Sequence, residues 1–221
     1  MNRRQVGNWA VSDAPAPGAP AVAVATGVTR FFRGREHLAF VVAAARRPAS
    51  AGRRLHFWSA GCATGEEPYS LAMALRADLP ASADWRILAT DISTLALQAA
   101  QRGNYTAAQA AAVPRRYAAT AFATRTGPDG DVLRIDDELK RMILFRRLDL
   151  GRTPYPVRGA FDTILCRDVM IDFDPRQRAG AVAEFHRLLR RGGHLIVGES
   201  EALPGVADRF ERSQPSVYRR I

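Results

Sequence analysis

The sequence has few cysteines, almost no lysine and no long apolar run. Its two cysteines, Cys62 and Cys166, are too few for a disulfide framework and predict a reducing compartment. We interpret both as small packing residues rather than nucleophiles. No run of eighteen apolar residues exists and no apolar signal segment precedes Ser12, so neither a membrane span nor a leader is expected. These absences predict a cytoplasmic protein without membrane insertion.

The charge of the chain is strongly positive, with a formal net value of +10. Nearly all of the basic residues are arginine, since Lys140 is the only lysine. One interpretation, which we favour, is a general bias toward arginine. The other is an acidic partner, either nucleic acid or an acidic protein surface, and charge alone does not separate these two. The histidines show no metal-ligand spacing, so no metal site is predicted.

Residues 55–71, LHFWSAGCATGEEPYSL, form the segment around which the chain is organised. An apolar run typical of a buried strand leads to a turn at Gly61 and Gly65, and a helix is predicted from Glu66 onward. Such a unit presents backbone N–H groups to a nucleotide-like ligand. It lacks the Lys and Ser or Thr of a phosphate loop and the third glycine of a dinucleotide fingerprint. A plain connecting turn therefore stays an alternative.

Strands and helices are predicted to alternate through most of the remaining chain. A strand over residues 85–89 leads to Asp91, where an acid is expected to bind ribose hydroxyls or, alternatively, to cap the helix that starts at Ser93. Further strands are predicted at 161–166, 195–198 and 217–218. A helix is predicted from Asp174 to the glycines at 192–193. The alternation predicts an α/β fold with a doubly wound, mostly parallel sheet.

Two regions depart from this alternation. Residues 1–25 are rich in alanine and proline and predict a flexible tail. A first helix is expected to begin near Thr29 or Arg35 and to end before Pro48. Within the domain of residues 26–221, two strand-forming runs flank the turn sequence GPDG, which predicts a small inserted β-subdomain at about 115–140.

Six segments resemble, in order and spacing, the chemotaxis receptor methyltransferases of the CheR family. They are VTRFFRGREHL, WSAGCATGEEPYSLAMAL, ILATDISTLALQAAQRGNY, RRLDL, FDTILCRDVMIDFD and FHRLLRRGGHLIVGESEAL. The resemblance implies a Rossmann-like class I methyltransferase fold with S-adenosylmethionine as cofactor and S-adenosylhomocysteine as product. It implies transfer of a methyl group to glutamate carboxylates on the cytoplasmic helical bundle of a methyl-accepting chemoreceptor, or on a receptor-like signalling protein. A monomer is expected, and the β-subdomain docks a receptor tail in some members.

The glycine turn and the resemblance together assign the site residues. The predicted cofactor-binding residues are Gly27, Thr29, Arg33, Gly61, Glu66, Asp91, Asp149, Leu150, Asp168 and Val169. Arg33 is also the predicted catalytic residue, because its planar guanidinium can pair with a carboxylate of the substrate or of the cofactor. The alternative for Arg33 is a surface side chain that covers Phe31 and Phe32. No general base is required, because a glutamate with a pKa of about 4.3 is already ionised at pH 7.

Several positions differ from the family pattern. Gly27, Asp149 and Asp168 stand where the family has asparagine, Asp172 where it has tyrosine, and Glu199 where it often has histidine. The resemblance also implies a helical amino-terminal domain, and we expect most of it to be missing before Thr29. These differences leave a degenerate, non-catalytic S-adenosylmethionine-binding regulatory module as the alternative. A nucleic-acid methyltransferase is disfavoured, because the loops of amino and carbon-5 methylation are absent and Lys140 is the only lysine.

Overall fold

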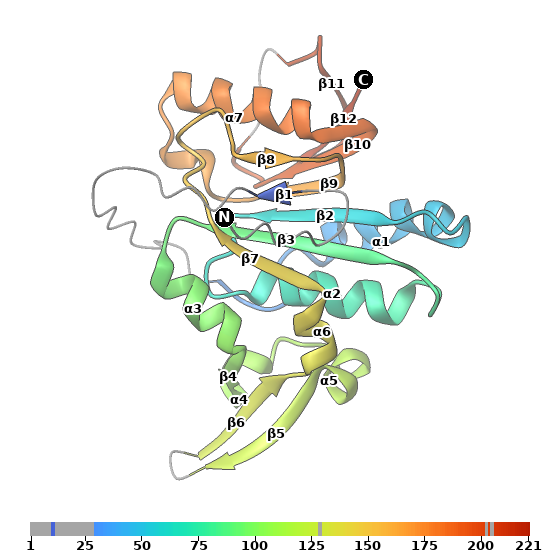
Figure 1. Cartoon of the computed structure of the whole chain (residues 1–221), viewed down its shortest axis with the longest axis vertical. Helices are drawn as coiled ribbons and strands as arrows, with labels where there is room; N and C mark the ends of the chain where they lie inside the picture. The colour runs from blue at the N-terminus through green and yellow to red at the C-terminus, as the bar shows by residue number, and fades with distance from the viewer. Residues whose placement is uncertain (1–9, 12–28, 128–129, 202, 204–205) are drawn as a thin grey trace.

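The computed structural model describes residues 10–11, 29–127, 130–201, 203 and 206–221. Its central sheet has seven strands in the order β11-β12-β10-β9-β2-β3-β7 (Figure 1). The strands are β2 (Leu55–Ala60), β3 (Trp85–Asp91), β7 (Ile143–Arg147), β9 (Phe161–Cys166), β10 (Leu189–Val197), β11 (Phe210–Gln214) and β12 (Val217–Arg220). The five from β10 to β7 are parallel, and β12 and β11 join antiparallel at one edge. The predicted doubly wound, mostly parallel α/β sheet is therefore confirmed.

Helices cover both faces of this sheet because the central strands are apolar on both sides. The longer helices are α1 (Arg35–Ser50), α2 (Glu66–Asp78), α3 (Thr94–Arg102) and α7 (Pro175–Leu188). Along β2, Phe57 packs in the core with α1 and α2, whereas its neighbour Trp58 packs in a second core with α7. This alternation follows the two-residue period of a strand.

The starts of α3 and α7 agree with the sequence prediction, whereas the ends of α1 and α7 differ from it. The Ser93 side chain accepts the N–H of Ala96 at the start of α3, and Asp174 caps α7, as predicted. However, α1 continues through Pro48 to Ser50, because buried Ala49 packs against the core and outweighs one missing backbone hydrogen bond.

The predicted end of α7 at residues 192–193 is wrong. The helix ends at Leu188, and β10 begins at Leu189 and passes through both glycines with a shift in register before His194. A Cβ at Gly193 would lie 2.9–3.1 Å from the carbonyl oxygens of Arg190, Asp162 and Phe161. The glycine therefore serves a close approach between strands rather than a helix stop.

A second, three-stranded antiparallel sheet lies at one end of the molecule (Figure 1). It consists of β4 (Asn104–Thr106), β6 (Gly130–Ile135) and β5 (Phe122–Gly127), with the short helices α4 (Ala107–Ala110), α5 (Arg115–Ala121) and α6 (Asp137–Arg141) beside it. Gly127 pairs with Gly130. The two residues between them, Pro128 and Asp129, lie outside the described residues, and β4 precedes the predicted bounds of 115–140.

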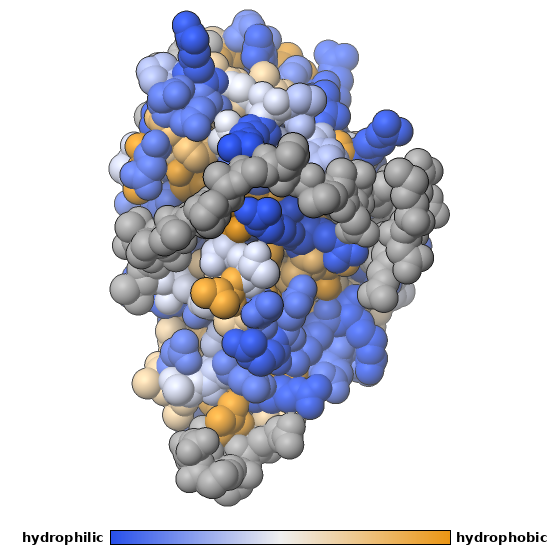
Figure 2. Space-filling view, turned by 60° about the vertical axis from the view of Figure 1, so that its left-hand side comes forward, coloured by the Kyte–Doolittle hydropathy of each residue, from blue (hydrophilic) through white to orange (hydrophobic). Residues whose placement is uncertain are grey.

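The chain before Thr29 is described only at β1 (Ala10–Val11), which pairs antiparallel with β8 (Val157–Arg158). This pairing falls within the stretch predicted as a flexible tail, and Gly27 lies outside the described residues. The face in Figure 2 is mostly hydrophilic with separate small apolar spots. Among the described residues, no helix is both long and apolar enough to cross a membrane.

Candidate active site

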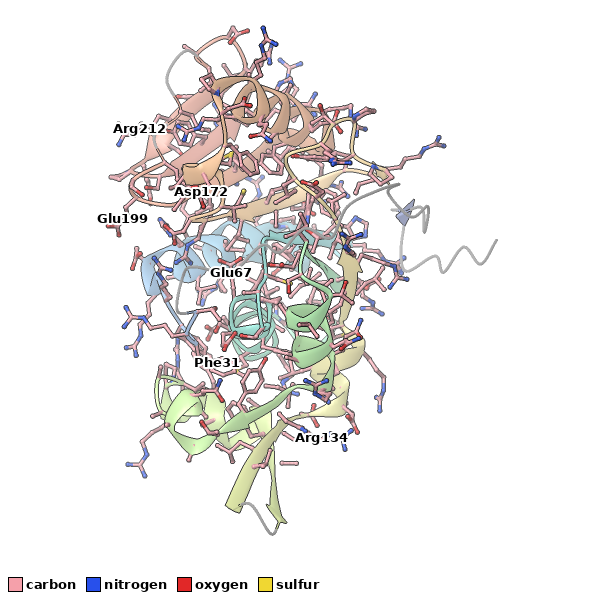
Figure 3. The ribbon with its side chains drawn as sticks, turned by 90° about the vertical axis from the view of Figure 1, so that its left-hand side faces the viewer. Phe31, Glu67, Arg134, Asp172, Glu199 and Arg212 are labelled. Carbon is pink, nitrogen blue, oxygen red and sulfur yellow. The ribbon has the colours of Figure 1, made fainter. Side chains whose placement is uncertain are left out.

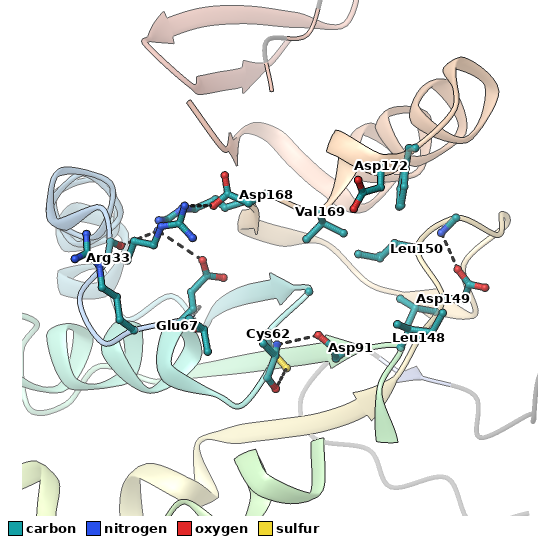
Figure 4. Close-up of a pocket in the computed structure, with 18 of the residues that line it drawn as sticks. Arg33, Cys62, Glu67, Asp91, Leu148, Asp149, Leu150, Asp168, Val169 and Asp172 are labelled. Atoms are coloured by element: carbon teal, nitrogen blue, oxygen red, sulfur yellow. Dashed lines mark hydrogen bonds and ion pairs between the residues drawn. The ribbon is translucent and has the colours of Figure 1, made fainter. Parts of the chain in front are cut away.

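A pocket with a volume of about 320 Å³ opens at the carboxyl ends of β2, β3 and β9 (Figure 4). The strand order reverses direction between β2 and β9, and such a switch point is where open α/β sheets bind their ligands. Eight of the ten predicted cofactor residues line it: Thr29, Arg33, Gly61, Asp91, Asp149, Leu150, Asp168 and Val169. Residues of the short helix η1 (Met170–Asp172) and of the segment before α1 complete the wall.

The glycine turn after β2 fits closely against the loop after β9. Gly61 has a φ of 87°, and a Cβ there would lie 2.3 Å from Cγ2 of Val169. Its N–H and that of Cys62 both donate to the carbonyl of Thr90 in β3. Only glycine therefore meets both the backbone conformation and the space at this position. The predicted importance of Gly61 has a structural basis in this contact with Val169.

Asp91 joins the two loops that follow β2 and β3. Its Oδ2 accepts the N–H of Ala63 at 2.8 Å, and its Oδ1 accepts the N–H of Ser93 at 2.8 Å. The carboxylate therefore orients the turn and the start of α3 while it lines the pocket. The cap of α3 is Ser93 rather than Asp91, and the predicted contact of Asp91 with ribose hydroxyls stays a prediction.

Of the two adjacent glutamates that start α2, the structure places Glu67 in the pocket and Glu66 outside it. Glu66 is buried and accepts the hydroxyl hydrogen of Thr64 at 2.7 Å. Glu67 accepts the hydroxyl hydrogen of Ser59 at 2.7 Å and lies 3.6 Å from the guanidinium of Arg167. The choice of Glu66 from the sequence is not supported by this geometry, because consecutive helical residues point about 100° apart.

Burial raises the pKa of Glu67, whereas Arg167 and the hydrogen bond from Ser59 lower it. Because burial is the largest cause, holding this carboxylate ionised costs free energy in the free protein. A cation in the pocket would offset that cost. Figure 3 shows Glu67 near the middle of the molecule, beside α2.

Arg33 faces the pocket and makes an ion pair with Asp168. Its Nη2 lies 2.7 Å from Oδ2 of Asp168, and its carbonyl accepts a 2.8 Å hydrogen bond from Arg167. Phe31 and Phe32 are themselves buried, in ring contacts with Tyr105 and Tyr117. The alternative in which Arg33 serves to cover these two rings therefore does not describe its main contact.

Glu201 is a residue that the sequence analysis did not single out. Its buried carboxylate accepts the N–H groups of Asp168 at 2.7 Å, of Met170 at 2.6 Å and of Gly198 at 2.8 Å. These three bonds fix the backbone of the loop after β9 to the end of β10. The sequence around Glu201 does not predict this role, because two of its three partners, Asp168 and Met170, lie more than thirty residues earlier in the chain.

Of the other positions that differ from the family pattern, some line the pocket and one does not. Asp149 accepts the N–H of Gly151 at 2.9 Å and lines the pocket together with exposed Asp172. Glu199 is exposed at the molecular surface and does not line the pocket (Figure 3). Three of the four described substitutions therefore bring a carboxylate to the pocket itself.

Neither an activated thiol nor a cluster of metal ligands is found among the described residues. Burial raises the pKa of both Cys62 and Cys166 well above the usual value, so neither thiol is activated as a nucleophile. Within the part of the chain that the structure describes, no group of three or more metal-ligating side chains occurs.

A sulfonium cofactor fits the residues present. The wall holds five carboxylates and three guanidiniums, a formal excess of two negative charges: Glu67, Asp91, Asp149, Asp168, Asp172, Arg30, Arg33 and Arg167. Carboxylates suit a sulfonium, an ammonium and ribose hydroxyls, and the arginines suit an amino-acid carboxylate. Leu148, Leu150, Val169 and Phe173 supply apolar surface for a base. This fold with such a pocket is the arrangement expected of a class I methyltransferase that uses S-adenosylmethionine.

The comparisons with known proteins identify the family. The family model described as "CheR methyltransferase, SAM binding domain" matches residues 27–219. Chemotaxis protein methyltransferase 2 of Pseudomonas aeruginosa is 35% identical over 81% of this chain and 64% of its own length. The chemotaxis protein methyltransferase of Escherichia coli is 36% identical over 87% of this chain and 67% of its own. The chain belongs to the CheR methyltransferase family, and it spans about two thirds of the length of these relatives.

Solved structures show a weaker similarity. The magnesium protoporphyrin IX methyltransferase of Synechocystis with bound SAM is 18% identical, with a TM-score of 0.43 over 84% of this chain and 76% of that chain. Nothing about the activity of the present chain rests on that likeness.

Proposed function

We propose that this chain transfers the methyl group of S-adenosylmethionine to glutamate carboxylates of a chemoreceptor helical bundle or of a receptor-like signalling protein. The observation that carries the proposal is the pocket at the switch point, with its excess of carboxylates and its paired arginines, in a chain of the CheR family. The relatives named above are chemotaxis protein methyltransferases. A cytoplasmic location and a monomeric state are part of the same proposal.

The proposed methyl transfer requires that the two reacting groups are positioned, and it requires no proton transfer. The bound cofactor supplies an electrophilic methyl group. A glutamate carboxylate is already ionised at neutral pH, and no histidine is among the described residues that line the pocket. The chain must therefore hold two reacting groups in line and exclude water, which can contribute roughly 7–11 kcal/mol to the barrier reduction.

Specific residues are proposed for each part of this task. Glu67 and Asp91 would hold the cationic and hydroxyl-bearing parts of the cofactor, and Leu150 and Val169 would pack against its base. Arg33 would guide the incoming carboxylate, since its guanidinium lies in the wall and already pairs with a carboxylate at 2.7 Å. The acceptor must compete with Asp168 for this cation.

Calorimetry with S-adenosylmethionine and S-adenosylhomocysteine tests the cofactor, and a labelled-methyl assay on receptor-containing membranes tests the reaction. We expect both ligands to bind and base-labile methyl esters to form on the receptor fraction. Binding without transfer to any receptor preparation would contradict the enzymatic proposal and indicate a regulatory binding module. Failure of both ligands to bind would contradict the proposal entirely.

A further inference from the structure

We propose that Asp168 makes this pocket select S-adenosylmethionine over its product, which lacks the sulfonium charge, at the expense of affinity for the carboxylate acceptor. The inference rests on the proposed function, because it concerns the same pocket. It starts from the carboxylate of Asp168, which lines the pocket and pairs with Arg33 at 2.7 Å.

The carboxylate of Asp168 is held in one place by its surroundings. Its backbone has a φ of 58°, and its N–H is bound by Glu201 at 2.7 Å. A Cβ at Gly198 would lie 2.6 Å from Oδ1 of Asp168, so only glycine leaves room for this side chain. Oδ2 lies 2.7 Å from Nη2 of Arg33. The acid therefore cannot move away from the pocket wall without disturbing three neighbours.

This fixed acid changes the charge of the pocket in a defined way. With Asp168 ionised, Arg33 is neutralised and the described wall keeps its excess of two negative charges. With an amide at the same place, Arg33 would be an unpaired cation and the excess would fall to one. S-adenosylmethionine carries one positive charge, on sulfur, that S-adenosylhomocysteine lacks. Only the affinity for the charged form should therefore depend strongly on this acid.

The same arrangement acts in the opposite sense on the acceptor. An incoming glutamate carboxylate meets an arginine that already has an anionic partner, and it also meets the charge of Asp168 itself. Selectivity for the cofactor and affinity for the acceptor are therefore coupled through one residue. Because S-adenosylhomocysteine lacks the sulfonium charge, it binds such a pocket more weakly than the cofactor does, and its release after the reaction is favoured.

Asp168→Asn tests the inference, because asparagine keeps the shape and tolerates a left-handed backbone. We expect the Kd of S-adenosylmethionine to rise by about three- to tenfold, whereas that of S-adenosylhomocysteine changes by less than about twofold. The KM for the acceptor should fall. Asp84→Asn is the matched control, because Asp84 also pairs with an arginine, Arg54 at 2.5 Å, but precedes β3 at the opposite edge of the sheet.

The outcomes separate the two proposals. An equal loss of affinity for both ligands would mean that Asp168 acts only through shape, and this would overturn the inference while leaving the proposed function intact. Selective weakening of S-adenosylmethionine binding in Asp168→Asn, with no methyl transfer by the unaltered protein, would support the inference and contradict the proposed function. Lack of binding to the unaltered protein would overturn both. Asp168→Gly, which suits the same backbone, must reproduce the selective loss, and its failure to do so also overturns the inference.

Discussion

The two ends of the parallel strands, which we call the carboxyl edge and the amino edge of the central sheet, have opposite charge. At the carboxyl edge, the proposed cofactor pocket has more carboxylates than guanidiniums in its wall. At the amino edge, a cavity of about 490 Å³ between α1 and β10 is lined by Arg53, Arg190 and Arg191 with a single acid, Asp162. In a chain with a net charge of +10, the active-site edge is thus the acidic one. The overall charge therefore says little about the ligand, because the ligand meets only the local field.

The acids at the two edges also have different partners. Asp162 pairs with Arg53 at 2.6 Å and lies 3.5 Å from Arg190, and it accepts the N–H of His56 at 2.8 Å. These contacts tie the starts of strands together. At the other edge, Glu201 accepts three backbone N–H groups of the described residues and holds the loop that carries Asp168. Changes at the carboxyl edge should therefore affect ligand binding, and changes at the amino edge only stability.

The largest contrast is expected between two glycines with positive φ. Gly61→Ala adds a Cβ 2.3 Å from Val169, whereas Gly192→Ala meets no atom within 4 Å. Backbone strain costs about 1–2 kcal/mol at either position, and overpacking adds about 1–3 kcal/mol at Gly61 alone. We expect urea denaturation to show a clearly larger loss for Gly61→Ala, together with loss of cofactor binding in calorimetry. Equal losses for the two variants would contradict this difference between the edges.

The next contrast compares Glu201, which is buried at the carboxyl edge, with Asp162, which is half-buried at the amino edge. Glu201→Gln replaces one acceptor oxygen with an N–H₂ group that faces backbone donors, so we expect the unfolding free energy to fall by about 2–3 kcal/mol. Asp162→Asn should cost about 1 kcal/mol, since its arginine partners are only half-buried and can still bind water. Calorimetry should show weaker cofactor binding for Glu201→Gln only. Weaker binding in Asp162→Asn would mean that the two edges are coupled.

A smaller effect is expected from histidines at the amino edge. Burial, and then the nearby Arg219, lower the pKa of His194, and burial also lowers that of His56. Below about pH 6.5 the unfolded chain therefore binds protons that the folded chain does not, so stability falls as the pH falls. The decline between pH 7 and 5, measured by urea denaturation, should be shallower in His194→Gln. An unchanged or steeper decline would show that other groups dominate.

The smallest effect is expected at Arg191, which is exposed beside the amino-edge cavity. Arg191→Glu reverses its charge far from the cofactor pocket. We expect changes of less than about 0.5 kcal/mol in unfolding free energy, and no measurable change in the Kd of S-adenosylmethionine. A shift in that Kd would show that the charge of the amino edge reaches the pocket, contrary to the comparison above.

Much of the fold followed from local pattern. The strand at 161–166 and the helix starts at Ser93 and Asp174 were predicted correctly, because apolar runs and capping side chains act over a few residues. The end of α7 was predicted wrongly, since a pair of glycines marks a helix stop and a strand bulge equally well. Most predicted cofactor residues line one pocket, although their roles there stay predictions.

The amino-acid sequence by itself determined the alternation of strands and helices, the glycine turn, the placement of acids at strand ends and the family to which the chain belongs. Tertiary structure decided that Glu67 rather than Glu66 enters the pocket, that Asp168 pairs with Arg33, and that Glu201 holds the loop that carries Asp168. The physical reason is range. Propensity and periodicity act between near neighbours, whereas the direction of a side chain and its charge partner depend on segments that meet only in the folded sheet.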